Sequence, residues 1–89
     1  MTNFGLYSLR DRLGDVFRSV SVDNNDMTAK RNFAYAVNNS PELLFQSKDL
    51  ELCRVAEFDA HSGQVIPCVP IVVVCRGDEV IYHDVSKNS

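Results

Sequence analysis

Hydrophobic and polar residues alternate along two short stretches near the N-terminus, Phe4–Arg10 and Val16–Val22. Alternation of this kind is typical of β-strands that bury one face. The segment between them, residues 11–15, is rich in Asp and Gly, which favour turns. The pattern therefore predicts an N-terminal β-hairpin.

If Asp11 pairs with Asp15 across this turn, the side chains of the hairpin divide between two faces, because they alternate along a strand. One face would carry Phe4, Leu6, Ser8, Arg10, Val16, Arg18, Val20 and Val22. The other would carry Tyr7, Leu9 and Phe17. The hairpin is thus expected to have one mixed face and one apolar, partly aromatic face.

A helical pattern follows, which predicts one amphipathic helix from about Asp26 to Asn38. Apolar residues recur there at i, i+4, i+7 and i+8, as on the buried side of a helix. These residues are Ala29, Phe33, Ala36 and Val37. Asn25 can cap the N-terminus, and the Asn-Asn-Ser-Pro run at 38–41 ends the helix. A short second helical turn is expected at 40–45, since Pro suits a first helical position.

The C-terminal half reads as a second hairpin. Leu50–Phe58 alternates as a third strand, and the turn-forming residues 59–63 lead to a fourth strand at Gln64–Ile66. Pro67 and Pro70 have no backbone N–H, so an edge, a bulge or a crossing segment is expected before a strand resumes. The remaining expected elements are a strand at Ile71–Cys75, a tight turn at 76–79, a last strand at Val80–Tyr82 and a polar, frayed tail at 84–89.

The order β-β-α-β-β with a β-rich C-terminal tail predicts an α+β fold, in which an antiparallel sheet packs on one amphipathic helix. The 89 residues fit a single domain, 1–89, and 45% hydrophobic with 24% charged residues is an ordinary globular composition. A domain of this size buries only about 60–65% of the surface of its unfolded chain, so dimerisation would add to a small stability margin.

No segment indicates secretion or contact with a membrane. The first five residues lack the basic and apolar regions of a signal peptide, and the apolar run at Val69–Cys75 is too short for a membrane span. The cysteines, Cys53, Cys68 and Cys75, have no C-x-x-C spacing and fit reduced thiols in a cytosol better than a disulfide framework.

No residue cluster indicates catalysis, a metal or a cofactor. His61 and His83 are far apart in the sequence, without the grouping of ligands that a zinc site needs. Gly14, Gly63 and Gly77 are single glycines at turns, and no Gly-rich loop is present to hold phosphates. We therefore expect a nonenzymatic protein without cofactor or metal.

Charge gives the clearest functional signal. The net charge of -3 and the pI near 5.2 have the wrong sign for a protein that binds nucleic acid mainly through phosphates, so any such binding needs a local patch. Basic and aromatic residues in the first half of the chain could form one for single-stranded DNA, where stacking contributes roughly 1–3 kcal/mol per base. The candidate DNA-binding residues are Arg10, Arg12, Arg18, Lys30, Arg31, Tyr7 and Phe17. Alternatively, the aromatic residues belong to the core or a dimer interface and the charges are only solvated.

Several short segments also follow the order seen in a known family. They are Tyr7-Ser8-Leu9-Arg10-Asp11, Asn25-Asp26, Ala29, Arg31, Phe33, Ala36-Val37-Asn38, Leu50-Glu51-Leu52, Glu57-Phe58-Asp59 and Ser62-Gly63. Over about residues 7–65 the chain resembles the small nonstructural protein of gokushoviruses, single-stranded DNA phages of the Microviridae. The part from Pro67 onward does not match.

The resemblance implies a DNA-binding or replication-associated role in the cytoplasm of a bacterial host, by analogy with a coliphage protein thought to favour single-stranded genome synthesis. It brings no catalytic residues. The matching residues Arg10, Asp11, Asn25, Arg31, Phe33, Asn38 and Asp59 also have structural explanations as turn, cap and core positions.

Two hypotheses follow from the residues and the resemblance together. The first is a nonenzymatic, homodimeric accessory that binds DNA, single-stranded DNA in preference, during genome replication or the switch to single-strand synthesis. The second is a protein-interaction module that redirects a host or phage replication protein, through a sheet edge or the face of Tyr7, Leu9 and Phe17.

Overall fold

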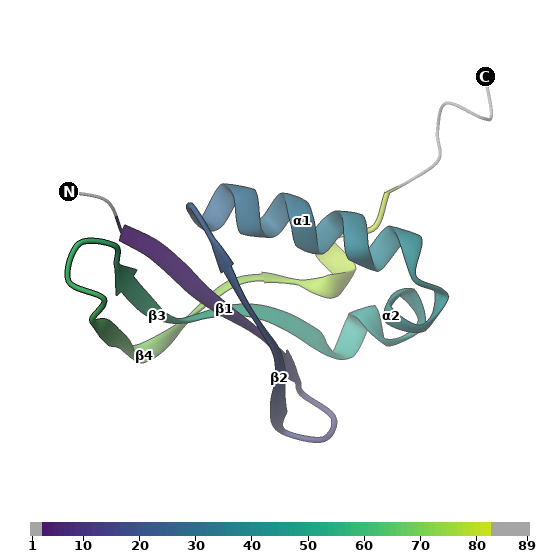
Figure 1. Cartoon of the computed structure of the whole chain (residues 1–89). Coiled ribbons are helices and arrows are strands. Elements are labelled where there is room, and N and C mark those ends of the chain that lie inside the picture. The colour runs from purple at the N-terminus through teal and green to yellow at the C-terminus, as the bar shows by residue number, and fades with distance from the viewer. Residues whose placement is uncertain (1–2, 83–89) are drawn as a thin grey trace.

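A computed structural model describes residues 3–82 as four antiparallel strands and a helical layer (Figure 1). The strands are β1 (Asn3–Asp11), β2 (Val16–Asp23), β3 (Leu50–Asp59) and β4 (Val65–Arg76), in the spatial order β2-β1-β3-β4. The helical elements are α1 (Asp26–Asn39), α2 (Pro41–Gln46) and the 3-10 turns η1 (Ser47–Asp49) and η2 (Gly77–Val80). The predicted α+β fold is confirmed; His83 and the expected tail at 84–89 lie outside the described residues.

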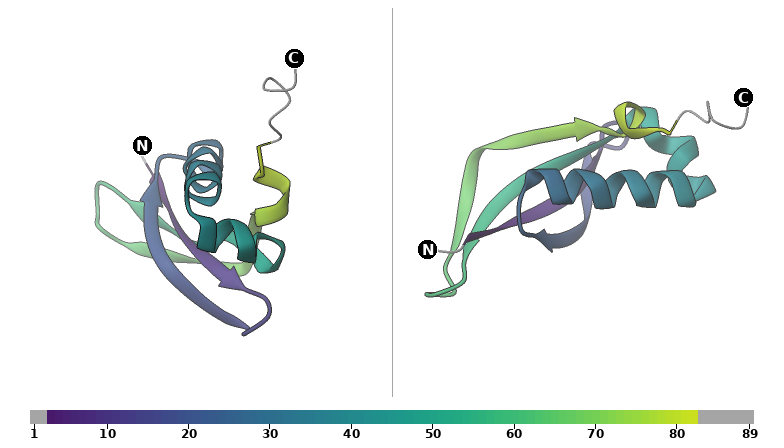
Figure 2. Two further views of the ribbon diagram at one scale, coloured as in Figure 1. Left: turned by 90° about the vertical axis from the view of Figure 1, so that its right-hand side faces the viewer. Right: turned by 90° about the horizontal axis from the view of Figure 1, so that it is seen from above.

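The helix α1 lies over one face of the twisted sheet, as the two views in Figure 2 show. We call this the helix-covered face. Within residues 3–82, no helix or strand lies against the other side of the sheet, which we call the open face (Figures 1 and 2). The fold therefore has two layers, and one side of the sheet faces solvent.

The β1–β2 hairpin is formed as predicted, but with a different register at the turn. Asp11 pairs with Val16 and not with Asp15. The Asp11 carboxylate accepts the backbone N–H groups of Leu13 (3.0 Å) and Gly14 (3.3 Å), so Asp11 stays in the strand and holds the turn closed. Asp15 lies inside the turn, with a φ of 54°.

The new register changes the two faces of the hairpin. Phe17 pairs with Arg10, so the predicted apolar face of Tyr7, Leu9 and Phe17 is wrong. Tyr7 and Leu9 lie on the helix-covered face, while Phe17 lies on the open face. Arg18 was predicted to share a face with Arg10. It pairs with Leu9 instead and therefore lies on the helix-covered face, whereas Arg10 lies on the open face.

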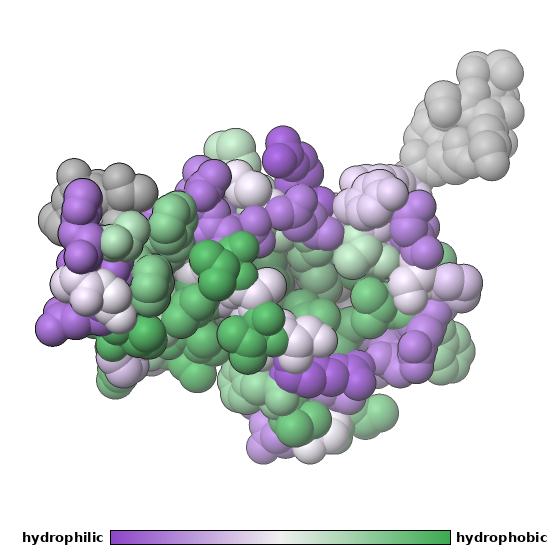
Figure 3. All heavy atoms as spheres, in the orientation of Figure 1, coloured by the Kyte–Doolittle hydropathy of each residue, from purple (hydrophilic) through white to green (hydrophobic). Residues whose placement is uncertain are grey.

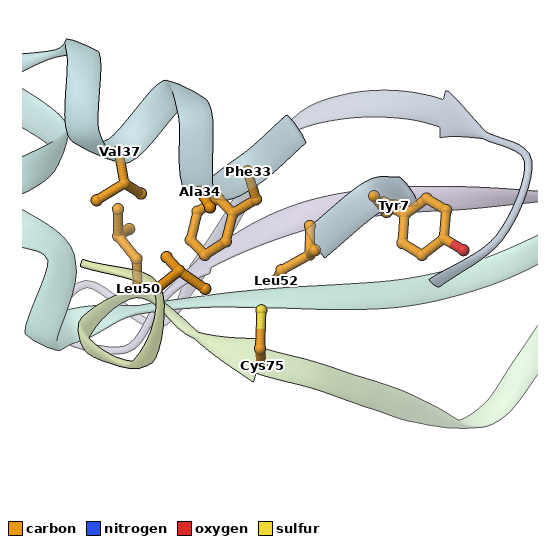
Figure 4. Close-up of a cluster of buried hydrophobic side chains, with 9 residues drawn as sticks. Tyr7, Phe33, Ala34, Val37, Leu50, Leu52 and Cys75 are labelled. Atoms are coloured by element: carbon orange, nitrogen blue, oxygen red, sulfur yellow. The ribbon is translucent and has the colours of Figure 1, made fainter. Parts of the chain in front are cut away.

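The core lies between α1 and the sheet, as Figure 4 shows. The helix contributes Ala29, Phe33, Ala34 and Val37, and the sheet contributes Tyr7, Leu50, Leu52 and Cys75. Three of the four predicted helix residues are buried; Ala34 is buried in place of Ala36, which is half-buried. The predicted cap is confirmed, because the side chain of Asn25 accepts the Thr28 N–H at 2.8 Å.

The edge strand β4 runs through both prolines. Pro67 pairs with Ala56 and Val72 pairs with Arg54, so four residues of β4 face a single residue of β3 between these pairs. This irregularity at an edge confirms the interpretation of the proline segment. The expected fourth strand and the strand that follows the prolines are two parts of one element.

The predicted last strand at Val80–Tyr82 is wrong. The Asn38 side chain donates to the Val80 carbonyl at 2.9 Å and accepts the Tyr82 N–H at 2.8 Å. These bonds tie the segment to the end of α1 and leave it outside the sheet. Gly77 allows η2 to lie close to η1, because a Cβ at residue 77 would overlap the backbone carbonyl of Ser47.

Candidate nucleic-acid interface

The open face is an apolar surface built from all four strands. Strand pairing places these side chains on it: Phe4, Leu6 and Arg10 from β1, Phe17 and Val22 from β2, Phe58 from β3, and Val65 and Val73 from β4. Cys53 and Ala56 of β3 are on the same side of the sheet but are buried. The prediction that Val22 shares a face with Leu6 is confirmed, and the two residues are paired directly. Figure 3 shows apolar side chains gathered over the strands below α1. Such a surface is a candidate for binding, since a small monomer rarely exposes many apolar groups together.

Three phenylalanines give the open face an aromatic character. Phe4 pairs directly with Phe58 across β1 and β3, and both are half-buried. Phe17 is 42% exposed, and the Arg10 guanidinium carbon lies 6.0 Å from its ring centroid, within reach of a cation–π contact. The sequence analysis missed Phe4 and Phe58 as site residues. Alternation along β1 predicted that Phe4 shares a face with Leu6. Phe58 could not be assigned to the same site from the sequence, because it meets Phe4 only through the pairing of β1 with β3.

Two of the predicted DNA-binding arginines already have acidic partners. Arg10 lies 2.9 Å from Asp15 and 3.6 Å from Glu51, and the hydrogen bond with Asp15 raises the pKa of Arg10. Arg12 lies 3.9 Å from Glu51. The Arg10–Asp15 pair is exposed and weak in water, so a phosphate could compete for the Arg10 guanidinium, whereas the Glu51 side chain is only 14% exposed. These ion pairs nevertheless reduce the positive charge at this end of the hairpin.

The other predicted cations lie on two separate surfaces. Arg18 donates to Gln46 at 2.7 Å and so connects β2 to α2. Lys30 and Arg31 are exposed on α1 and line a groove that ends at Tyr82, on the side of the helix away from β2. Among residues 3–82 none of these three side chains forms an ion pair. The predicted set of cations is therefore not one continuous patch.

Tyr7 was predicted to contact bases, and the structure contradicts this. Its side chain is 1% exposed, and its hydroxyl donates to Asp26 at 2.6 Å. Burial, followed by the bond to the Asp26 carboxylate, raises the pKa of Tyr7 well above its ordinary value. Gly5 leaves the space for the ring, because a Cβ there would overlap the Tyr7 hydroxyl. Tyr7 is a core residue and has no surface on which a base could stack.

A polar network that sequence reasoning missed surrounds the Tyr7 hydroxyl. Arg54 donates to Asp26 and to Glu57, each at 3.1 Å, and to the Cys68 sulfur at 3.4 Å. Asp26 stands in the first turn of α1, so these bonds hold the start of the helix against β3. Arg54 within β3 and Asp26 at the start of α1 are visible as charged residues in the sequence, but their pairing could not be predicted without the fold.

The three thiols are free, and two of them are buried. Burial raises the pKa of Cys53, and it raises the pKa of Cys75 to about 11, so both are protonated at neutral pH. Within the described part of the chain, no group of three or more His, Cys, Asp or Glu side chains is placed to hold a metal ion. No helix in residues 3–82 is long and apolar enough to cross a membrane.

Comparison with known proteins identifies the family. The family model described as Phage ORF5 protein matches residues 4–80, which includes all four strands and the helical layer. Neither a curated protein nor a solved structure matches the chain. The match covers well over half of the sequence, including the part after Pro67 that the earlier resemblance left out. The chain therefore belongs to the Phage ORF5 protein family and is a bacteriophage protein.

Proposed function

We propose that this phage protein is a nonenzymatic accessory that binds single-stranded DNA on the open face of its sheet. The observation that carries the proposal is the uncovered face on which Phe4, Phe58 and Phe17 lie with Arg10. Aromatic rings on a sheet surface stack on unpaired bases, and a neighbouring guanidinium can bind phosphate or stack as well. The proposed site thus keeps Phe17 and Arg10 from the sequence prediction and replaces Tyr7 by Phe4 and Phe58.

Single-stranded DNA is preferred for a physical reason. The bases of a duplex already stack on one another, so their faces are not available to side chains on a flat sheet. Neutralisation of the duplex backbone would need several cations together, whereas the cations here are divided between the hairpin and α1. The open face therefore suits a strand whose bases are unpaired.

The resemblance to the gokushovirus nonstructural protein supports a role for this DNA binding in the replication of a phage genome. A phage with a single-stranded genome exposes unpaired DNA in the cytoplasm of its bacterial host during replication. A protein that covers this DNA would favour single-strand synthesis over renewed duplex replication. We assign the protein to that stage, as a nonenzymatic factor.

Fluorescence anisotropy with a labelled short oligonucleotide tests the proposal, with a duplex of the same sequence as comparison. We expect binding to the single strand at low salt and much weaker binding to the duplex. Phe17→Ala should weaken binding about 5- to 150-fold, the loss of one base stack. Phe45→Ala is the matched control, because Phe45 is 85% exposed but lies on α2, away from the open face.

Absence of binding at low salt would overturn the proposal. An equal loss of affinity in the two Phe variants would also overturn it, because the open face would then have no special part in binding. Circular dichroism of both variants checks that the fold is retained.

A second candidate, a module that binds a replication protein, is favoured by the apolar character of the same face. Val22, Val65 and Val73 are exposed there and offer nothing that is specific for DNA. Retention of one protein from nuclease-treated host lysate, lost with Val65→Lys and kept with Phe45→Ala, would support this candidate. It would displace the first if the anisotropy titration showed no binding.

A further inference from the structure

A groove runs between α1 and the segment that follows β4. One wall is residues 79–82, which the Asn38 side chain binds to the last turn of α1. The other wall is one side of α1, at positions i, i+3, i+4 and i+7. These positions are Met27, Lys30, Arg31 and Ala34. We call this the α1–η2 groove; its volume of about 380 Å³ is within the range of ligand sites.

The floor of the α1–η2 groove is apolar. Ala34 and Val80 are buried members of the core, and Ile81 packs against it. At the rim, Met27 on α1 is 81% exposed and Tyr82 on the other wall is 60% exposed. An apolar side chain of a ligand would cover both rim residues and remove them from water.

The cations of the groove have no acidic partner. Lys30 and Arg31 are both exposed, and neither forms an ion pair within residues 3–82. Glu79 also lines the groove, but its carboxylate accepts the backbone N–H of Arg76 at 2.7 Å. The groove thus has a positive charge in a chain whose net charge is -3. It is complementary to a ligand with carboxylates next to an apolar group.

We propose that the α1–η2 groove binds an acidic peptide segment of a partner protein. One apolar side chain of the peptide lies between Met27 and Tyr82, and its carboxylates lie against Lys30 and Arg31. Met, Tyr and Arg are among the residues enriched in protein interfaces, and Met adapts its shape to different partners. Single-stranded DNA would need several stacking rings and more cations, whereas the groove has one ring and two cations.

The groove is separate from the open face of the sheet. It belongs to the helical layer, and the left view in Figure 2 shows β2 and η2 on opposite sides of α1. A peptide in the groove and DNA on the open face would therefore not compete. The proposal does not depend on DNA binding, and the failure of one leaves the other standing.

Fluorescence anisotropy of a short labelled peptide, titrated with the full chain, tests the proposal. The peptide has several aspartates next to a single phenylalanine. We expect weak binding, with Kd of about 10 μM to about 1 mM, that falls with salt. Replacement of the aspartates by asparagines, or of the phenylalanine by alanine, should weaken binding at least about 5-fold. No binding of the acidic peptide up to about 1 mM, or equal binding of the three peptides, would overturn the proposal.

Charge reversal on α1 tests the location of the site. Lys30→Glu and Arg31→Glu should each weaken binding of the acidic peptide at least about 5-fold, and both side chains are exposed, so the fold is retained. The double variant should instead bind a peptide with lysines in place of the aspartates better than the wild type does. Lys48→Glu is the matched control, because it makes the same change of charge at an exposed position of η1 outside the groove.

Three results would contradict this site. Equal loss of binding in Lys48→Glu would mean that only the net charge matters. Displacement of the peptide by an unlabelled single-stranded oligonucleotide would assign the groove to DNA. Stronger binding in Asp84→Asn, but not in Glu42→Gln, would assign the groove to the residues of this chain that follow Tyr82.

Discussion

Tyr7 has a structural role in the core, and not the base-stacking role that its position on a basic hairpin predicted. An aromatic residue on a basic hairpin fits a base-stacking role, yet its ring lies below α1 and its hydroxyl bonds to Asp26. That position depends on which face of β1 the helix covers. The same aromatic chemistry is available at Phe17, because the hairpin register moves Phe17 to the other face.

Tyr7→Phe removes the hydroxyl and leaves the ring in place. We expect the free energy of unfolding to fall by about 1–2 kcal/mol, because Asp26 loses a short hydrogen bond but keeps its contact with Arg54. Urea denaturation measures the change, and Tyr35→Phe, at an exposed position on α1, is the control. DNA affinity should be unchanged; a loss of affinity with full stability would return Tyr7 to the binding site.

At the scale of elements, local sequence signals predicted nearly every strand and helix. Alternation identified β1, β2 and β3, and the helical period with the Asn25 cap identified α1. These signals are local, so they need no knowledge of distant residues. They also predicted that Val22 shares a face with Leu6, and this holds because the extra residue of the β2 bulge, between Arg18 and Ser21, restores the alternation that the longer turn had shifted.

The elements that failed depend on contacts between distant or competing groups. The hairpin register is set by the Asp11 carboxylate in the turn, which holds one more residue than assumed. The segment after Gly77 has the composition of a short strand, but the Asn38 side chain binds it to α1. The Phe4–Phe58 pair of the candidate site likewise exists only because β1 and β3 are neighbours.

Gly77 tests the placement of η2 against η1. Gly77→Ala should destabilise the protein by about 1–3 kcal/mol, because its Cβ would overlap a backbone atom of Ser47, which cannot move aside as a flexible side chain can. Gly14→Ala is the control, since the nearest atom to its Cβ would be 3.6 Å away. Thermal denaturation compares the two. Equal stability of both variants would contradict the packing described for η2.

For the whole molecule, the balance of charge governs how DNA binding should respond to salt. The net charge is -3, Arg10 and Arg12 face acidic partners, and the remaining cations lie on separate surfaces. Stacking must then provide most of the affinity. We expect a slope of log Kobs against log salt no steeper than about -2, the value for three phosphate contacts on a single strand.

Anisotropy titrations at several salt concentrations measure this slope. Arg10→Gln should reduce it by less than one unit, and Lys30→Gln should leave it unchanged, because Lys30 lies across α1 from the hairpin. A slope of about -4 or steeper would mean that phosphate contacts dominate. The binding surface would then have to include both groups of cations, against the arrangement proposed for the open face.

The bonds between Asn38 and the segment Val80–Tyr82 have a practical consequence for the handling of this protein. They hold Val80 and Tyr82 beside the end of α1, on the helical side of the sheet. A fluorophore or affinity tag joined downstream of Tyr82 therefore starts from the helical side. A tag at the other end would start beside Asn3, next to the Phe4–Phe58 pair, and could block the surface being assayed.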